Sequence, residues 1–227
     1  IGPEVAQRLA AGYRSDNFFQ VYGMTETGPV GSVLYPDEQV SKAGSIGRVG
    51  LPGVDVRVVT ANGGQARADQ VGEIWIRTAT TMIGYLDDPE ATRAAIDADG
   101  WYHTGDLARV DDDGYLFIVD RTKDMIITGG ENVYSKEVED ALTAHPAIAE
   151  AAVVGRPHPE WGQTVIAHIV RIDGADDVPE DLTTFLAGRL ARYKIPREFH
   201  VAQSLPRTPT GKIQKHLINT PELSTTA

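Results

Sequence analysis

The chain has 227 residues, 21 Lys and Arg, 32 Asp and Glu, a formal net charge of −11 and no Cys. This length suits one large domain or two modest ones, and it buries enough surface to fold without covalent cross-links. The lack of Cys excludes a disulfide framework, a Cys-ligated metal site and a thiol nucleophile. The acidic balance argues against binding to duplex DNA, so we expect no nucleic-acid partner. No apolar run approaches the roughly 20 residues of a membrane-spanning helix.

Residues 1–120 are predicted to form mainly short antiparallel strands, as in a small barrel or a distorted sheet. Alternating apolar residues bounded by Gly and Asn indicate strands, and the acidic run at 111–114 indicates a hairpin turn. The expected elements are the end of a helix within 4–11, a buried strand over 18–21 that enters a glycine turn, strands over 54–59 and 72–77, a short helix over 90–96, and hairpin arms over 107–110 and 115–119.

Residues 121–227 change in character, because helices now separate apolar strands rich in β-branched residues. The expected strands are 125–128, 148–154, 165–172 and 197–201, and the expected helices are 136–143 and 182–191. We therefore predict an α+β fold, with a distorted β-barrel-like subdomain in 1–120, a small α+β domain in 121–227 and a boundary near 120–123. Within 189–216 there are seven cationic residues and one acidic residue. This local positive charge could bind a polyanion such as ATP or CoA, or it could belong to a solvated basic tail.

The first motif is Tyr-Gly-Met-Thr-Glu at 22–26, directly after a predicted strand. Gly23 allows a tight turn, Thr25 offers a hydroxyl, and Glu26 offers an oxygen ligand of the kind that Mg²⁺ prefers. These residues suit a phosphate and its Mg²⁺, or else an ordinary loop in which Thr25 and Glu26 cap the backbone.

The second motif, Trp-Tyr-His-Thr-Gly-Asp at 101–106, places Asp106 beside a predicted glycine turn. A buried carboxylate there can accept both hydroxyls of a ribose. It can equally accept two backbone N–H groups in an Asx turn.

The third motif extends from 120 to 139, across the predicted boundary. Arg121 offers a forked donor, and Lys123 lies where a hinge would absorb backbone rotation. Gly129 and Gly130 allow positive φ or a close approach of the backbone to a ligand. The alternative to a ligand site is a plain strand, turn and helix whose polar side chains are solvated.

The fourth motif, Leu-Pro-Arg-Thr-Pro-Thr-Gly-Lys-Ile at 205–213, presents Lys212 on a stiff loop. A lysine at this place can neutralise an anionic transition state, or it can simply be solvated. The loop is not a Walker A loop, because the upstream Gly and the following Ser or Thr are missing.

Together and in this order, the motifs resemble those of the adenylate-forming superfamily, which includes acyl-CoA and aryl-CoA synthetases and the adenylation domains of peptide synthetases. The resemblance covers about 1–218 and includes YGMTE, GEIWIR, GYLDDPEAT, GWYHTGD, DRTKDMIITGGENVYSKEVE, the Glu-Trp-Gly turn at 160–162 and LPRTPTGKI. It implies a two-step reaction. A carboxylate attacks the α-phosphate of ATP in the presence of Mg²⁺ and releases pyrophosphate, and a thiol, usually that of CoA, then displaces AMP.

For the first step, the resemblance implies that Lys212 is catalytic and bridges the attacking carboxylate and the ribose or phosphate oxygens. It implies that the nucleotide is held by Thr25 on the phosphate, Glu26 on Mg²⁺, Tyr22 near the adenine, and Asp106 with Arg121 on the ribose, while Gly23 gives the substrate room.

For the second step, the resemblance implies that the small domain rotates about Lys123 and moves Lys212 out of the site. Gly129, Gly130 and Glu131 would then border the channel for the pantetheine arm of CoA. Basic side chains of the small domain would meet the CoA phosphates.

The resemblance also implies a C-terminal portion of a longer enzyme, because the family's early Ser/Thr/Gly-rich phosphate loop has no counterpart here and the first residue is Ile1. The N-terminal portion would then be a partner, and the chain alone is expected not to catalyse adenylation. We expect a fatty, medium-chain or hydroxycinnamic acid as substrate, with Met24 and residues near 30–33 at its pocket. Two alternatives remain open: the chain could belong to an enzyme that loads a carrier protein, or it could be a binding fragment without turnover. The oligomeric state also remains open. We expect a cytoplasmic location.

Overall fold

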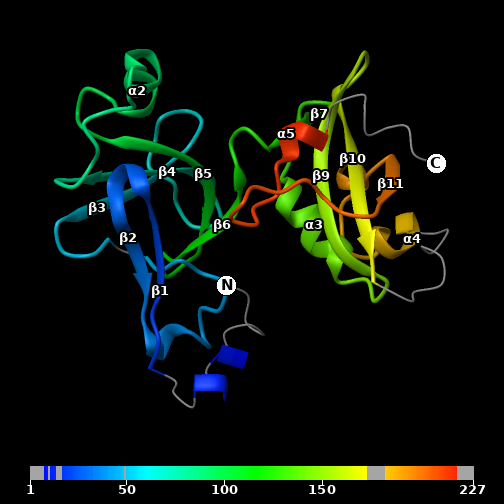
Figure 1. Cartoon of the computed structure of the whole chain (residues 1–227), viewed down its shortest axis with the longest axis horizontal. Coiled ribbons are helices and arrows are strands. Elements are labelled where there is room, and N and C mark those ends of the chain that lie inside the picture. Colours follow the sequence, from blue (N-terminus) through cyan, green and yellow to red (C-terminus); the bar gives the residue numbers. More distant parts are fainter. Residues whose placement is uncertain (1–7, 10, 14–16, 49, 173–181, 219–227) are drawn as a thin grey trace. The chain divides into compact units, whose positions relative to one another are not determined.

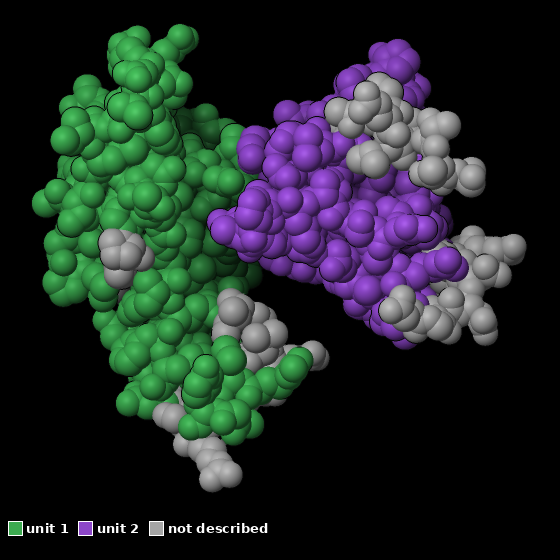
Figure 2. All heavy atoms as spheres, viewed as in Figure 1, with its two compact units in different colours: residues 1–122 green, residues 123–227 purple. Residues whose placement is uncertain are grey.

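The computed structural model of the chain describes residues 8–9, 11–13, 17–48, 50–172 and 182–218 (Figure 1). The chain divides into two compact units, Ile1–Thr122 and Lys123–Ala227 (Figure 2). The division falls after Thr122, and the boundary was expected near 120–123. The helix end expected within 4–11 falls largely outside the described residues.

Unit 1 contains a two-stranded ribbon and a four-stranded antiparallel sheet in the order β3-β4-β5-β6. The ribbon strands are β1 (Gln20–Met24) and β2 (Gly28–Leu34), and the sheet strands are β3 (Val54–Val59), β4 (Val71–Thr78), β5 (Tyr102–Val110) and β6 (Leu116–Arg121). The short helical elements are η1 (Thr25–Thr27), η2 (Pro36–Glu38) and α2 (Pro89–Ala95). These bounds confirm the strands expected at 54–59 and 72–77, the short helix and the acidic hairpin.

The ribbon and the sheet of unit 1 are joined into a barrel-like body. A bridge links Ser32 to Gly50, and the segment after the ribbon bonds to β6 through Ile46 N to Leu116 O (2.9 Å) and Leu116 N to Gly47 O (2.9 Å). Inside, alternate residues of the strands form one apolar core, to which Ile46, Val58, Ala66, Ile74, Ile76, Ala108 and Leu116 contribute. The distorted barrel expected from the short strands is therefore confirmed.

Two expectations for the first strand are wrong. The strand begins at Gln20 rather than 18 and continues through Gly23, whereas Phe19 and Val21 are 54% and 49% exposed. In this two-stranded ribbon Tyr22 packs against the core and Val21 points to the other face. Gly23 lies within the strand, and the tight turn comes later, where Gly28 has a φ of 87°.

Unit 2 is built on a five-stranded sheet in which β10 pairs with β9, with β11 and, at one end, with β7. Its strands are β7 (Ile126–Thr128), β8 (Glu131–Val133), β9 (Ile148–His158), β10 (Gly162–Arg171) and β11 (Glu198–Ala202). Its helical elements are α3 (Ser135–Thr143), α4 (Leu182–Ala187), η3 (Arg192–Lys194) and α5 (Lys215–Ile218). This α+β layer agrees with the prediction, except that β8, η3 and α5 were not foreseen.

The two faces of this sheet bury different residues, because successive side chains of a strand point to opposite faces. One face packs against α3 and α4 through Val138, Leu142 and Leu186. The other face packs against the C-terminal segment through Leu205 and Ile218. Helix α4 was expected to reach residue 191 but ends at Ala187, because Gly188 disfavours a further helical turn.

A histidine pair on the second face makes the stability of unit 2 dependent on pH. His168 on β10 lies opposite His200 on β11, with ring centroids 4.9 Å apart. Burial, followed by the charges of His200 and Arg156, lowers the pKa of His168 to about 4. Glu198 also faces this group, because it bonds to Arg156 and lies 3.3 Å from His200 Nε2.

We predict that the free energy of unfolding falls as the pH drops from about 6.5 to about 4. In this window the unfolded chain takes up a proton on His168 that the folded chain refuses, so acid favours unfolding. His168→Gln should remove on the order of 1 kcal/mol of this pH dependence, measured by urea unfolding at a series of pH values. The exposed His216→Gln is the control, and identical profiles for the two variants would contradict the assignment.

Candidate functional site

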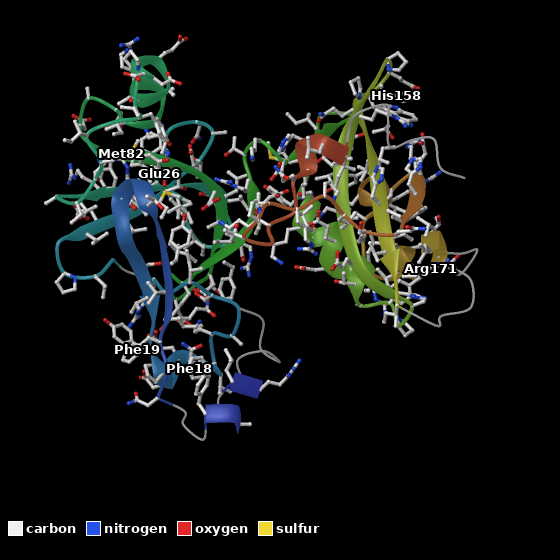
Figure 3. All side chains as sticks on the ribbon, viewed as in Figure 1. Phe18, Phe19, Glu26, Met82, His158 and Arg171 are labelled. Atoms are coloured by element: carbon white, nitrogen blue, oxygen red, sulfur yellow. The ribbon has the colours of Figure 1, made fainter. Side chains whose placement is uncertain are left out.

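The turn that carries Thr25 and Glu26 is fixed by a neighbouring loop of unit 1. Met82 N donates to Glu26 O at 2.7 Å. Figure 3 labels Met82 and Glu26 at one end of the β1–β2 ribbon and Phe18 and Phe19 at the other end. A Cβ on Gly28 would lie 2.8 Å from Thr80 Oγ1, so only glycine permits this close approach.

The Glu26 carboxylate lies beside the Tyr85 hydroxyl, which in turn contacts that of Tyr102. Tyr85 OH is 3.4 Å from Glu26 Oε1 and 3.0 Å from Tyr102 OH. Burial, then the Tyr85 hydrogen bond and the Glu26 charge, raises the pKa of Tyr102, so its hydroxyl stays protonated. The side chain of Thr25 is exposed and, within the described part of the chain, has no bonded partner.

Glu26 and Thr25 could bind a magnesium ion only together with other ligands, such as phosphate oxygens and waters. Among the described residues no three His, Cys, Asp or Glu side chains gather to form a cage. Mg²⁺ commonly takes one or two carboxylates, with substrate phosphates and waters as its other ligands. Glu26 as a single carboxylate and Thr25 as a neighbouring hydroxyl fit that pattern.

A second carboxylate, Asp106, gathers three of the predicted site residues from three strands. Asp106 Oδ2 accepts from Tyr22 OH at 2.7 Å, and Asp106 Oδ1 accepts from Arg121 Nε at 3.0 Å. Burial, followed by the Asp106 charge, raises the pKa of Tyr22, so its phenol remains a donor. Gly23, the next residue on β1, is exposed.

Asp106 stands on a bulge of β5, where we had expected a turn. Trp75 pairs with His103 and Glu73 pairs with Leu107, so residues 104–106 all lie opposite Ile74. A bulge of this kind redirects a side chain out of the regular pleat. Gly105 has a φ of 71°, which residues with a Cβ rarely adopt.

Side chains replace the backbone bonds that this bulge breaks. Thr104 Oγ1 donates to Ile74 O (2.7 Å) and accepts from Asp106 N (3.1 Å). Glu73 Oε1 accepts from Gly105 N at 2.8 Å. The Gly105 carbonyl accepts from Thr122 N at 2.8 Å.

Glu73 and Thr104 were missed from the sequence as contributors to this site. The available signal was a polar residue at a half-buried position of the alternating segment GEIWIR.

In unit 2, Gly129 and Gly130 form the turn between β7 and β8. Their φ values are 58° and 84°, and Thr128 pairs with Glu131, as in a two-residue hairpin whose central residues both need positive φ. The Gly129 N–H donates to Trp161 O at 2.9 Å, which fixes the turn against the start of β10. Lys123 and Glu131 are exposed.

Lys212 is presented by a closed turn. Thr208 N donates to Lys212 O (2.8 Å), Lys212 N donates to Thr208 Oγ1 (3.1 Å), and Gly211 has a φ of 87°. The Lys212 side chain is exposed and has no partner among the residues that the structure describes. Its neighbour Lys215 is instead held by Ser135 Oγ (2.6 Å) and Glu139 Oε1 (2.6 Å).

Family profiles match both units. The profile of the AMP-binding enzyme matches residues 1–86, and that of the AMP-binding enzyme C-terminal domain matches residues 137–212. The chain belongs to the adenylate-forming enzymes. It corresponds to the C-terminal portion of these enzymes, which confirms the resemblance seen in the motifs.

Individual relatives agree with this assignment. A fatty acid–[acyl-carrier-protein] ligase of Streptomyces coeruleorubidus is 42% identical over 86% of this chain and 38% of its own length. A feruloyl-CoA synthase of an Amycolatopsis species is 42% identical over 94% of this chain and 44% of its own length. The structure of o-succinylbenzoate CoA synthetase from Bacillus subtilis with its acyl-adenylate intermediate has a TM-score of 0.85 and 34% identity, over 96% of this chain and 44% of that one. The chain thus spans about two fifths of the length of these relatives.

We predict that Gly105→Ala lowers the free energy of unfolding of the chain by about 1–2 kcal/mol, the cost of the left-handed conformation for a residue with a Cβ. The cost is conformational, since a Cβ at Gly105 would meet no atom within 4 Å. Gly64→Ala in the same unit is the control, because a Cβ at Gly64 meets only ordinary contacts and its φ is not left-handed. Urea unfolding of both variants tests this, and equal losses would contradict it.

Proposed function

We propose that the chain is the C-terminal part of an ATP-dependent acyl-CoA synthetase. The observation that supports this most directly is the Asp106 carboxylate held between Tyr22 and Arg121 on a β-bulge. Such a carboxylate can accept the two hydroxyls of a ribose, with the phenyl ring of Tyr22 beside the adenine. The side chain of Asp106 is 15% exposed, which leaves its oxygens within reach of a ligand.

In the proposed first step, a carboxylate oxygen of the acid attacks the α-phosphorus of ATP and pyrophosphate leaves. Holding two anions together requires positioning and positive charge. Thr25 binds phosphate, Glu26 holds the magnesium ion, and Lys212 bridges the attacking carboxylate and the ribose or phosphate oxygens. When bound, Mg²⁺ supplies neutralisation of the phosphate charge.

In the proposed second step, the thiol of CoA attacks the acyl carbon and AMP leaves. The small domain turns about Lys123 between the steps, and Gly129, Gly130 and Glu131 border the pantetheine channel. The paired left-handed glycines suit this role, because they expose backbone without side chains that would fill the channel.

The identity of the acid and of the acceptor belongs to this proposal. Relatives whose names give fatty acid and feruloyl-CoA chemistry support a fatty or hydroxycinnamic acid. The fatty acid–[acyl-carrier-protein] ligase supports a second candidate, in which a carrier-protein thiol takes the place of CoA. Discharge of the acyl-adenylate by free CoA or by a carrier protein distinguishes the two. Among the described residues no helix is long and apolar enough to cross a bilayer, and the cytoplasmic location stays a prediction.

We predict that the 227-residue chain alone does not catalyse adenylation. It spans about two fifths of its relatives, and the family's early phosphate loop has no counterpart in it. An ATP–pyrophosphate exchange assay with a panel of fatty and hydroxycinnamic acids should show no acid-dependent exchange. Exchange at the rate of a full-length relative would overturn this prediction.

We predict that Lys212→Ala, in the full-length protein, slows acyl-adenylate formation at least about 100-fold, as expected for the loss of a charge that stabilises a transition state. Thioester formation from supplied acyl-adenylate should change far less. Lys136→Ala is the control, because Lys136 is also an exposed lysine of unit 2, and among the described residues its ammonium pairs only with Asp140, one turn along α3. Equal losses in both half-reactions would reject the role given to Lys212.

A further inference from the structure

We propose that Glu73 is a positioning residue of the nucleotide site, which acts through the Gly105 N–H to aim Asp106. The inference rests on the proposed role of Asp106 as the ribose ligand. Glu73 lies on β4 and reaches the bulge of β5 from the neighbouring strand, where its Oε1 accepts from Gly105 N at 2.8 Å. Gly105 directly precedes Asp106, so the φ and ψ angles of Gly105 determine where the Asp106 side chain begins.

Both oxygens of the Glu73 carboxylate are in use. Its Oε2 accepts from Trp75 Nε1 at 3.0 Å. The Trp75 ring is itself fixed, because it stacks on His103 with centroids 3.8 Å apart and 12° between the planes, and Arg57 lies 4.6 Å from its centroid. The indole therefore holds the carboxylate at one end while the other end receives Gly105.

The Gly105 N–H needs this acceptor because the bulge takes it out of the strand ladder. Residues 104–106 lie opposite Ile74 alone, and the Ile74 carbonyl already accepts from Thr104 Oγ1. An N–H that is buried without a partner costs about 1–3 kcal/mol, and a half-buried one such as that of Gly105 costs less. Gly105 also has the freedom of a residue without a Cβ, so loss of the acceptor would let its backbone angles change.

Gly105 is also bonded on its other side, through its carbonyl. This carbonyl accepts from Thr122 N, directly after β6, at 2.8 Å, and Asp106 pairs across the ladder with Arg121, whose Nε bonds to Asp106 Oδ1 at 3.0 Å. A change in the backbone angles of Gly105 would therefore disturb the Asp106–Arg121 pair as well.

Unit 1 offers a closely matched control in Glu38. Glu38 Oε1 accepts from Tyr115 OH at 2.6 Å, and Glu38 Oε2 accepts from Tyr35 N at 3.0 Å. It therefore has the same kind of partners as Glu73, one backbone N–H and one aromatic donor, but none of them belongs to the bulge.

The first experiment compares Glu73→Leu, Glu73→Gln, Glu38→Leu and Glu38→Gln in the 227-residue chain by ¹H–¹⁵N NMR. We expect the Gly105 amide to lose its downfield, carboxylate-bonded position in Glu73→Leu, and the Arg121 Nε–H signal to shift with it. Glu73→Gln keeps an acceptor oxygen but loses its charge, so the Gly105 amide should move only part of the way upfield, and the Trp75 indole N–H should be released. Both Glu38 variants should leave these three signals in place. An unchanged Gly105 amide signal in the Glu73 variants would overturn the proposal, and the partial shift in Glu73→Gln decides if the leucine variant fails to fold.

The second experiment measures ATP kinetics of the same Glu73 variants in the full-length protein. A ribose contact is present in both ground and transition states, so its loss raises KM more than it lowers kcat. We expect Glu73→Leu to raise the KM for ATP about 10-fold, the effect of a weakened hydrogen bond to a charged group, and Glu73→Gln to restore most of it. An unchanged KM for Glu73→Leu would reject its role in the site. Asp106→Ala tests the proposed function separately, because an unchanged KM there rejects Asp106 as the ribose ligand while the NMR signals still judge Glu73.

Discussion

Gly105 is the point at which the sheet of unit 1 leaves regular pairing, and the candidate nucleotide site depends on it. Its N–H is bound by Glu73 and its carbonyl by Thr122 N, both at 2.8 Å. Because both backbone groups of Gly105 are held, Asp106 leaves the pleat in one direction. There it meets a phenol from β1 and a guanidinium from β6. A bulge leaves backbone groups without their ladder partners. Here side chains bind those groups, so the bulge is a rigid support for a carboxylate.

How far the sequence could predict this arrangement depends on the range of the interactions. Strands such as 54–59 and 72–77 follow from local alternation of apolar residues, and they are confirmed. The bulge at 104–106 was read as a turn, because its glycine and aspartate occur in both and the bonds that distinguish them come from Glu73 and Ile74, about thirty residues earlier. Phe19 and Val21 were expected to be buried because they are apolar, but a ribbon of two strands covers only one of its faces in the described residues.

The two C-terminal lysines of unit 2, Lys212 and Lys215, lie in opposite environments. Lys215 is half-buried and bound to Ser135 and Glu139 of α3, and Glu139 also accepts from Val153 N at 2.8 Å. Together with Leu205 and Ile218, which pack on the sheet, it anchors the C-terminal segment. Lys212 extends from the turn of that segment into solvent. A charge on a fixed base with a free side chain suits a group that must reach a ligand and later withdraw.

The proposed hinge at Lys123 lies directly after the residues that support Asp106. Thr122, the last residue of unit 1, is bound to the Gly105 carbonyl, and the next strand begins only at Ile126. A hinge requires a few residues that absorb changes in φ and ψ beside an element that does not move. Rotation at Lys123 would therefore begin beyond Thr122 and leave the Asp106–Arg121 pair in place. In the proposed mechanism Gly105, which precedes the proposed ribose ligand, would thus also be bonded to the fixed end of the hinge, so one bulge would hold the nucleotide through both half-reactions.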